Sequence, residues 1–221
     1  KFESITMENF MRYKGRNHIE FSCDDVKNVT VVLGDNTVGK TTIAQAFRWG
    51  LYGALMANGT KSAGDFQLLN TDILEMMDAN SRAKVKVEIA AVDEEKRYII
   101  TRETTYTRAF PKLESREFQK KCAMRITELE DMESYVEVDS NEIETLINEL
   151  FPKNLSHYFL FDGERWNDVS VGGVRENIKE SVHILTGLSA YREAKNHLKD
   201  MGSNSVIKKF RSEIKGSGAV Y

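Results

Sequence analysis

Alternating and periodic apolar positions predict three strands and a helix within the first 55 residues. Residues 2–7 and 19–21 alternate around the polar turn RYKGRN, which is typical of two short strands. The apolar run at residues 29–33 ends at a glycine and predicts a central strand that is buried on both faces. Between residues 41 and 55, apolar side chains recur at helical spacing. A strand at residues 29–33, a loop that begins at the glycine and a helix at residues 41–55 therefore follow one another.

The middle of the chain has the two-residue period of strands. Residues 84–91 alternate between charged and apolar side chains, and residues 98–102 follow an acidic turn, which predicts a β-hairpin. Successive strands without intervening helices indicate an antiparallel subdomain. The polar stretch from residue 59 to 82 has no period that assigns a structure. Further strands are expected at residues 104–110, 122–129 and 135–138.

The remainder of the chain returns mainly to helical spacing. A helix is expected to begin with Ser140 as its N-cap and to end at Leu150, ahead of Pro152. Residues 158–161 predict a second buried strand. Residues 174–201 predict a helix, and the same spacing of apolar residues begins again at residues 207–214. This spacing fits either the start of a coiled coil or one amphipathic helix. The last residues supply no helix cap, so we expect the chain to continue.

These elements predict an α/β fold in four parts. We expect a phosphate-loop core at residues 1–58, an antiparallel β-subdomain at 59–139, a helix with a strand and loop at 140–171, and a helix directed toward a coiled coil at 172–221. Of the 221 residues, 41% are hydrophobic and 29% are charged, as in soluble globular proteins. No apolar run is long enough to span a membrane, so we expect a cytoplasmic protein.

Charge and cysteine content exclude some functions. The formal net charge of -3 excludes a uniformly basic coat for nucleic acid. Residues 82–125 are a local exception, with 12 Lys and Arg against 7 Asp and Glu. This stretch fits either a solvated sheet edge protected by lysines or a surface that contacts the DNA backbone at Lys84, Lys86 and Arg97. Cys23 and Cys122 are too far apart in sequence for a metal-ligand pair.

The most specific motif is the loop that follows the apolar run. GDNTVGKT at residues 34–41 matches G-x-x-x-x-G-K-[ST], a loop that binds the phosphates of a nucleoside triphosphate. Its glycines let backbone N–H groups turn toward phosphate, and the next helix directs its positive end there. Lys40 is expected to contact the β- and γ-phosphates, and the Thr41 hydroxyl to bind Mg²⁺. The expected ATP-binding residues are Gly34, Asp35, Asn36, Thr37, Val38, Gly39, Lys40, Thr41 and Thr42.

Hydrolysis needs further groups, and two interpretations of one segment stay open. YFLFDGE places Asp162 after an apolar strand and Glu164 two residues later. Asp162 could bind Mg²⁺ as a Walker B carboxylate with Glu164 as the base, although a glycine separates the two acids. A strand that ends in Asp-Gly is also an ordinary turn. The rival functions are a self-contained NTPase that uses this pair and a nucleotide-gated binding module without turnover.

The motifs together resemble a known family. The start ITMENFMRYKG, the IEF after it and the segment VTVVLGDNTVGKTTIAQAFRWGLYG are similar to the N-terminal half of SMC-like, SbcC-type ABC ATPases of DNA metabolism. FLFDGERW lies where that family has its glutamine loop, with Asp162 at the glutamine position. The phrase F-D-G-E is most similar to the DndD ATPases of bacterial DNA phosphorothioation and related defence systems.

The resemblance implies a role and partners. Asp162 would sense Mg²⁺ and the γ-phosphate and couple them to rotation of the lobe. Relatives often carry an arginine at the position of Met11, and here either Arg12 or Lys14 would replace it, or both would be solvated charges of the turn. Tyr13 would lie near the nucleotide base or in the core. The C-terminal half of the same head would supply the signature motif, and ATP would join two heads as a homodimer. DNA and other proteins of a DNA-modification, repair or defence system are the further partners implied.

Overall fold

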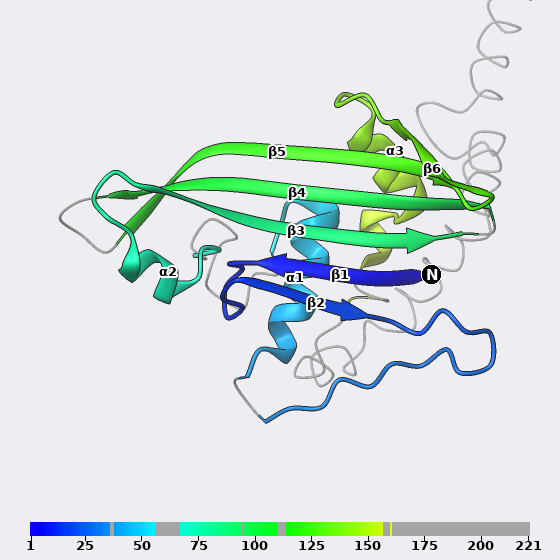
Figure 1. Cartoon of the computed structure of the whole chain (residues 1–221), viewed down its shortest axis with the longest axis horizontal. Coiled ribbons are helices and arrows are strands. Elements are labelled where there is room, and N and C mark those ends of the chain that lie inside the picture. The colour runs from blue at the N-terminus through cyan, green and yellow to red at the C-terminus, as the bar shows by residue number, and fades with distance from the viewer. Residues whose placement is uncertain (36–37, 56–66, 94, 110–113, 157–159, 161–221) are drawn as a thin grey trace, which may run out of the picture. The chain divides into compact units, whose positions relative to one another are not determined.

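Six antiparallel strands form one sheet in the order β2-β1-β3-β4-β5-β6 (Figure 1). The computed structural model describes residues 1–35, 38–55, 67–93, 95–109, 114–156 and 160. The chain divides into two units, Lys1–Asp162 and Gly163–Tyr221, and all described residues belong to the first. The strands are β1 (Phe2–Glu8), β2 (Arg16–Glu20), β3 (Arg82–Val92), β4 (Lys96–Ala109), β5 (Glu114–Glu128) and β6 (Asp131–Glu137). The predicted paired strands at the start and the predicted hairpin and antiparallel sheet are confirmed.

The register of the sheet explains which face is buried. Ile89 of β3 lies opposite Ile5 of β1 on one side and Ile100 of β4 on the other. All three side chains are fully buried, and residues two positions along each strand share their face. The alternate positions carry the charged residues of β3, such as Lys86 and Glu88, which are partly exposed. One face of the sheet is therefore apolar and the other is polar.

Helix α1 (Lys40–Tyr52) packs against the apolar face. Its closest approach is at Gly50, where an added Cβ would lie 2.6 Å from Cδ1 of Ile89 and 3.1 Å from Cγ1 of Val87. Only a residue without a side chain permits this approach of helix to strand. Figure 1 shows α1 and α3 (Ile143–Leu150) together behind the sheet. The helix predicted after the glycine-rich loop is confirmed.

One helix boundary differs from the expectations, and one helix was not predicted. Ser140 is not the N-cap of α3: the helix begins at Ile143, and the Asp139 carboxylate accepts a hydrogen bond from the Asn141 N–H. The side chain of Asp139 therefore forms a turn where a helix start was expected. Helix α2 (Thr71–Met76) was not predicted, although Asn70 caps it by accepting from the N–H groups of Asp72 and Ile73. A short 3₁₀ helix, Lys153–Leu155, follows α3.

Residues 29–33 do not form the predicted central strand, and that prediction is wrong. They lie in an irregular segment between β2 and the glycine-rich loop, where Val29 is 76% and Leu33 88% exposed. A buried strand needs neighbours that pair with its backbone groups on both edges. Every described strand pairs antiparallel within the six-stranded sheet. Among the described residues, no strand pairs with residues 29–33.

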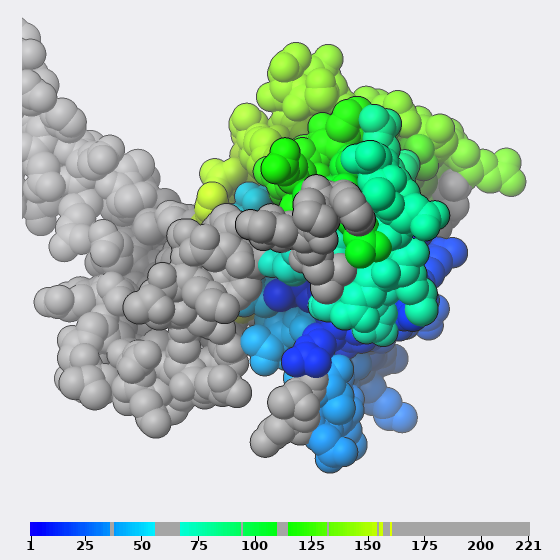
Figure 2. Space-filling model, turned by 90° about the vertical axis from the view of Figure 1, so that its left-hand side faces the viewer, coloured from blue at the N-terminus to red at the C-terminus, as the bar shows by residue number. Residues whose placement is uncertain are grey.

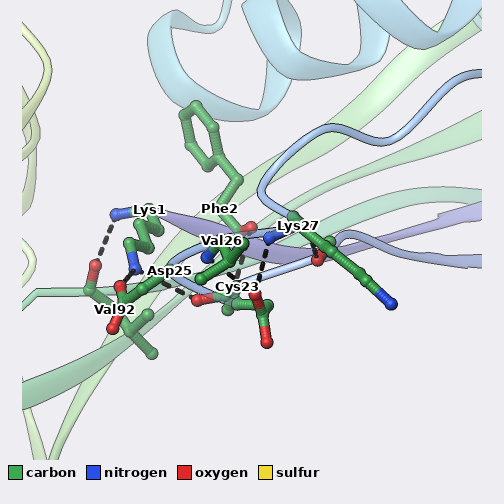
Figure 3. Close-up of polar contacts among 9 residues, drawn as sticks. Lys1, Phe2, Cys23, Asp25, Val26, Lys27 and Val92 are labelled. Carbon is green, nitrogen blue, oxygen red and sulfur yellow. Dashed lines mark hydrogen bonds and ion pairs between the residues drawn. The ribbon is translucent and has the colours of Figure 1, made fainter.

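The start of this irregular segment is fixed to the sheet (Figure 3). The Lys1 ammonium pairs with Asp25 at 2.5 Å and donates to the Cys23 carbonyl at 3.0 Å. The Cys23 thiol donates to the Phe2 carbonyl at 3.5 Å, and the terminal amine donates to the Val92 carbonyl. The hydrogen bond from Lys1 lowers the pKa of Asp25. These contacts tie the segment to the ends of β1 and β3.

The C-terminal predictions fall outside the described residues. These are most of the strand at residues 158–161 and the whole helix at residues 174–201. Within the described part of the chain, no helix is both long and apolar enough to cross a membrane.

Candidate nucleotide-binding site

The glycine-rich loop ends in a backbone conformation that requires glycine. Gly39 has φ of 115° and is the N-cap of α1, in a region that L side chains rarely adopt. An added Cβ at Gly39 would also lie 3.4 Å from the Tyr13 ring, and one at Gly34 would lie 2.7 Å from Cγ2 of Val38. Both motif glycines therefore lie where a side chain would distort the loop. Asn36 and Thr37 lie outside the described residues.

Lys40 spans this loop. Its ammonium donates to the Asp35 carbonyl at 2.8 Å and to the Gly34 carbonyl. The side chain is exposed, so its charge is accessible to a ligand at the loop. A point charge fixed across a glycine loop and at a helix start is suited to attract the terminal phosphates of a nucleotide.

The first turn of α1 supplies the remaining groups of the motif. The Ile43 N–H donates to the Gly39 carbonyl at 3.2 Å, which starts the helical hydrogen bonds. The first N–H groups of a helix have no intrahelical partner and can bind an anion. Thr41 is exposed and so accessible to a metal ion, whereas Thr42, the last of the expected ATP-binding residues, is 7% exposed. The loop and helix start fit a nucleotide phosphate chain.

The magnesium prediction rests on Thr41 and Asp162. Among the described residues, no group of three or more His, Cys, Asp or Glu side chains could hold a metal ion. Mg²⁺ in nucleotide sites is bound by one or two protein groups together with phosphates and water, so an exposed Thr41 fits that chemistry. Asp162 lies outside the described residues, as does Glu164, and their roles stay predictions.

The turn between β1 and β2 lies against the loop. The Tyr13 hydroxyl donates to the Gly39 carbonyl at 3.4 Å, and burial raises the pKa of this half-buried phenol. The Asn70 side chain fixes the turn by donating to the Met11 carbonyl at 2.7 Å. In Figure 2 the dark-blue residues after β1 lie between the teal residues of α2 and β3 and the light-blue residues near the start of α1. Tyr13 thus supports the loop backbone.

Arg12 and Lys14 flank Tyr13 in this turn. Arg12 is exposed, and no contact with the described part of the loop is present. Lys14 lies 3.7 Å from the Asp72 carboxylate, so its charge is directed toward α2. The backbone places Arg12 beside a residue that contacts Gly39, and its contact with phosphate remains a prediction.

Comparison with known proteins assigns the chain to a family. A family model described as an AAA domain matches residues 4–215. The chain belongs to this AAA-domain family. A solved structure described as "Structural biochemistry of ATP-driven dimerization and DNA stimulated activation of SMC ATPases" is similar over 80% of this chain and 95% of that chain, with 16% sequence identity and a TM-score of 0.45. No curated protein matches the chain.

A contact that Arg48 of α1 makes in this AAA domain was not predicted from the sequence. Arg48 is 8% exposed, and its guanidinium donates to the Leu160 carbonyl. The only sequence signal is a charged residue at a helix position between the buried Phe47 and Trp49. Leu160 lies two residues before Asp162 in the sequence.

The polar face of the sheet carries paired charges. Lys84 lies 2.9 Å from Glu103, Lys86 lies 2.9 Å from Glu88, and Arg97 lies 2.6 Å from Glu3. The three basic residues expected to contact DNA are therefore already neutralised by carboxylates. Among the described residues of this stretch, Arg116 and Lys121 are exposed and have no carboxylate within ion-pair distance.

Proposed function

We propose that this AAA domain is the N-terminal, ATP-binding lobe of a cytoplasmic SMC-like ATPase that acts in DNA metabolism. The observation that carries the proposal is Lys40, which bonds to the carbonyls of Gly34 and Asp35 at the start of α1. The left-handed conformation of Gly39 and membership of an ATP-using family support the same site. The sequence resemblance to SMC-like ATPases narrows the proposal to that class.

Each group at the loop has a distinct task in this function. The N–H groups at the start of α1 bind phosphate oxygens, and Lys40 neutralises charge on the terminal phosphates. The Thr41 hydroxyl would hold Mg²⁺, which would supply positive charge to the phosphates. Tyr13 keeps the Gly39 carbonyl in place from the other side. These residues bind and orient ATP without cleaving it.

The exposed segment before the loop indicates how the head is completed. Residues 29–33 are exposed and all are apolar except Thr30, with Leu33 directly before Gly34. We infer that a strand from the C-terminal half of the same head pairs with this segment and buries it, since exposed apolar runs of this kind mark interaction sites. Two such heads would join through ATP as a homodimer, each supplying its signature motif to the other.

The finer biological setting rests on a short motif. F-D-G-E at residues 161–164 resembles the DndD ATPases, so DNA phosphorothioation or a related defence system is the setting we propose. The motif lies outside the described residues. Other proteins of that system would be the partners.

The test of this function is ATP turnover. Residues 1–221 are expected to bind Mg·ATP but to hydrolyse it at least about a hundredfold more slowly per site than the full-length protein, because groups supplied across an interface contribute factors of that size. Asp162→Gln should leave nucleotide binding nearly intact and change turnover or head association only in the full-length protein. The measurement is steady-state phosphate release under identical Mg²⁺.

The opposite outcome favours the self-contained NTPase. Comparable rates per site in the two proteins, with both metal binding and turnover abolished in Asp162→Asn, would identify Asp162 and Glu164 as a Walker B pair. Absence of turnover in both proteins, with ATP still bound, would favour the binding module.

A second experiment tests the interaction with DNA. The double change Arg116→Glu and Lys121→Glu on β5 is expected to weaken DNA binding. It should also reduce the salt slope of the affinity by about one for each phosphate that the variant no longer neutralises. Lys27→Glu, on the exposed segment after β2, is the control: it reverses one charge, half the change of the double variant, at a position outside the sheet. An unchanged salt slope in the double variant would show that the basic stretch only solvates a sheet edge.

A further inference from the structure

Arg48 joins two parts of the chain that are far apart in sequence. It lies on α1 eight residues after Lys40, which places it about 12 Å along the helix from the phosphate loop. Its guanidinium donates to the carbonyl of Leu160, a separation of 112 residues. Both residues are 8% exposed, so the contact is shielded from water. A buried hydrogen bond from a charged donor is stronger than a neutral one.

Leu160 is itself held in place. Its N–H donates to the Ser156 carbonyl at 2.8 Å, and Ser156 is 3% exposed. Two further contacts tie α1 to the chain before Leu160. The Tyr52 hydroxyl donates to the Phe151 carbonyl at 3.1 Å, and Arg102 of β4 bridges the end of α1 to Glu144 of α3. Of the α1 residues that take part in these contacts, Arg48 is the nearest in sequence to the phosphate loop.

We propose that Arg48 is a positioning residue that couples the phosphate loop to the backbone at Leu160. Phosphate binding at the start of α1 acts on a rigid helix, and Arg48 transmits any shift of that helix to the Leu160 backbone. Asp162 follows two residues later in the sequence. This inference rests on the proposed function and adds the residue through which the coupling runs.

The experiment compares hydrogen exchange in the full chain with and without a non-hydrolysable Mg·ATP analogue. Arg48→Met removes the donor while keeping an unbranched side chain, and Arg48→Lys keeps the charge. Tyr52→Phe is the matched control, since it removes a different hydrogen bond between α1 and the same region. In the wild-type chain the analogue is expected to slow exchange at residues 34–42 and by at least about fivefold at residues 155–165.

The variants separate coupling from binding. In Arg48→Met, slowing at residues 34–42 and affinity by calorimetry should persist, while slowing at residues 155–165 disappears. Arg48→Lys should restore part of it, and Tyr52→Phe should retain all of it. The inference about Arg48 is overturned if Arg48→Met keeps the full slowing at residues 155–165, or if Tyr52→Phe abolishes this slowing as completely as Arg48→Met does. The proposed function would stand in either case. Absence of slowing at residues 34–42 in the wild-type chain would overturn the proposed function and the inference with it.

Discussion

Lys40→Ala is expected to abolish detectable binding of Mg·ATP. The lysine ammonium spans the glycine loop through the carbonyls of Gly34 and Asp35, so its charge is fixed where the terminal phosphates bind. Charge-assisted hydrogen bonds to phosphate contribute about 1.5–3 kcal/mol each. Removal of two such bonds corresponds to a fall in affinity of at least about a hundredfold. Isothermal titration calorimetry with Mg·ATP measures this change.

The fold should survive this substitution. Lys40 is exposed, and its removal opens no cavity in the core. The melting temperature without nucleotide should stay close to the wild-type value, while stabilisation by added Mg·ATP should disappear. Lys27→Ala removes a lysine from the exposed segment after β2 and should leave affinity unchanged. Wild-type affinity in Lys40→Ala would contradict the assignment of this loop as the nucleotide site.

The sheet could be predicted because its pattern follows from local rules. Alternation along β3 places Val85, Val87 and Ile89 on the buried face, and the acidic turn before Lys96 returns the chain as β4. Residues 29–33 show the limit of the same rule. An apolar run predicts burial, but burial requires a partner strand, and no sequence pattern within the described residues shows where that partner lies.

In the candidate site too, the sequence predicts some of the residues and not others. The loop motif predicts Gly39 and Lys40 because phosphate chemistry requires a particular residue type at each position. Tyr13 and Arg48 act through contacts that join residues 26 and 112 positions apart. Such contacts depend on how the sheet folds over α1. The pattern along the chain predicts the elements and not which side chains meet across them.

Arg102→Met is expected to lower the free energy of unfolding by about 2–3 kcal/mol, since hydrogen bonds to charged groups contribute in that range and a buried carbonyl left unpaired adds a penalty. The Arg102 guanidinium donates to the carbonyls of Gly50 and Leu51 at 3.2 and 3.1 Å, at the C-terminal end of α1. It also pairs with Glu144 at 2.8 Å, and its side chain is 14% exposed. A cation at this end also opposes the negative pole of the helix. Urea unfolding measures the change.

A substitution of Glu144 separates the ion pair of Arg102 from its hydrogen bonds to the helix carbonyls. Glu144 is 61% exposed, so Glu144→Gln should cost at most about 1 kcal/mol, the usual limit for a solvated ion pair. The larger effect of Arg102→Met would then come from the helix carbonyls of Gly50 and Leu51. Arg102→Met should leave Mg·ATP affinity unchanged, since Tyr52 at this end of α1 lies about 18 Å along the helix from Lys40. Equal decreases of stability in the two variants would assign the effect to the ion pair, and α1 would then lack C-terminal support from β4.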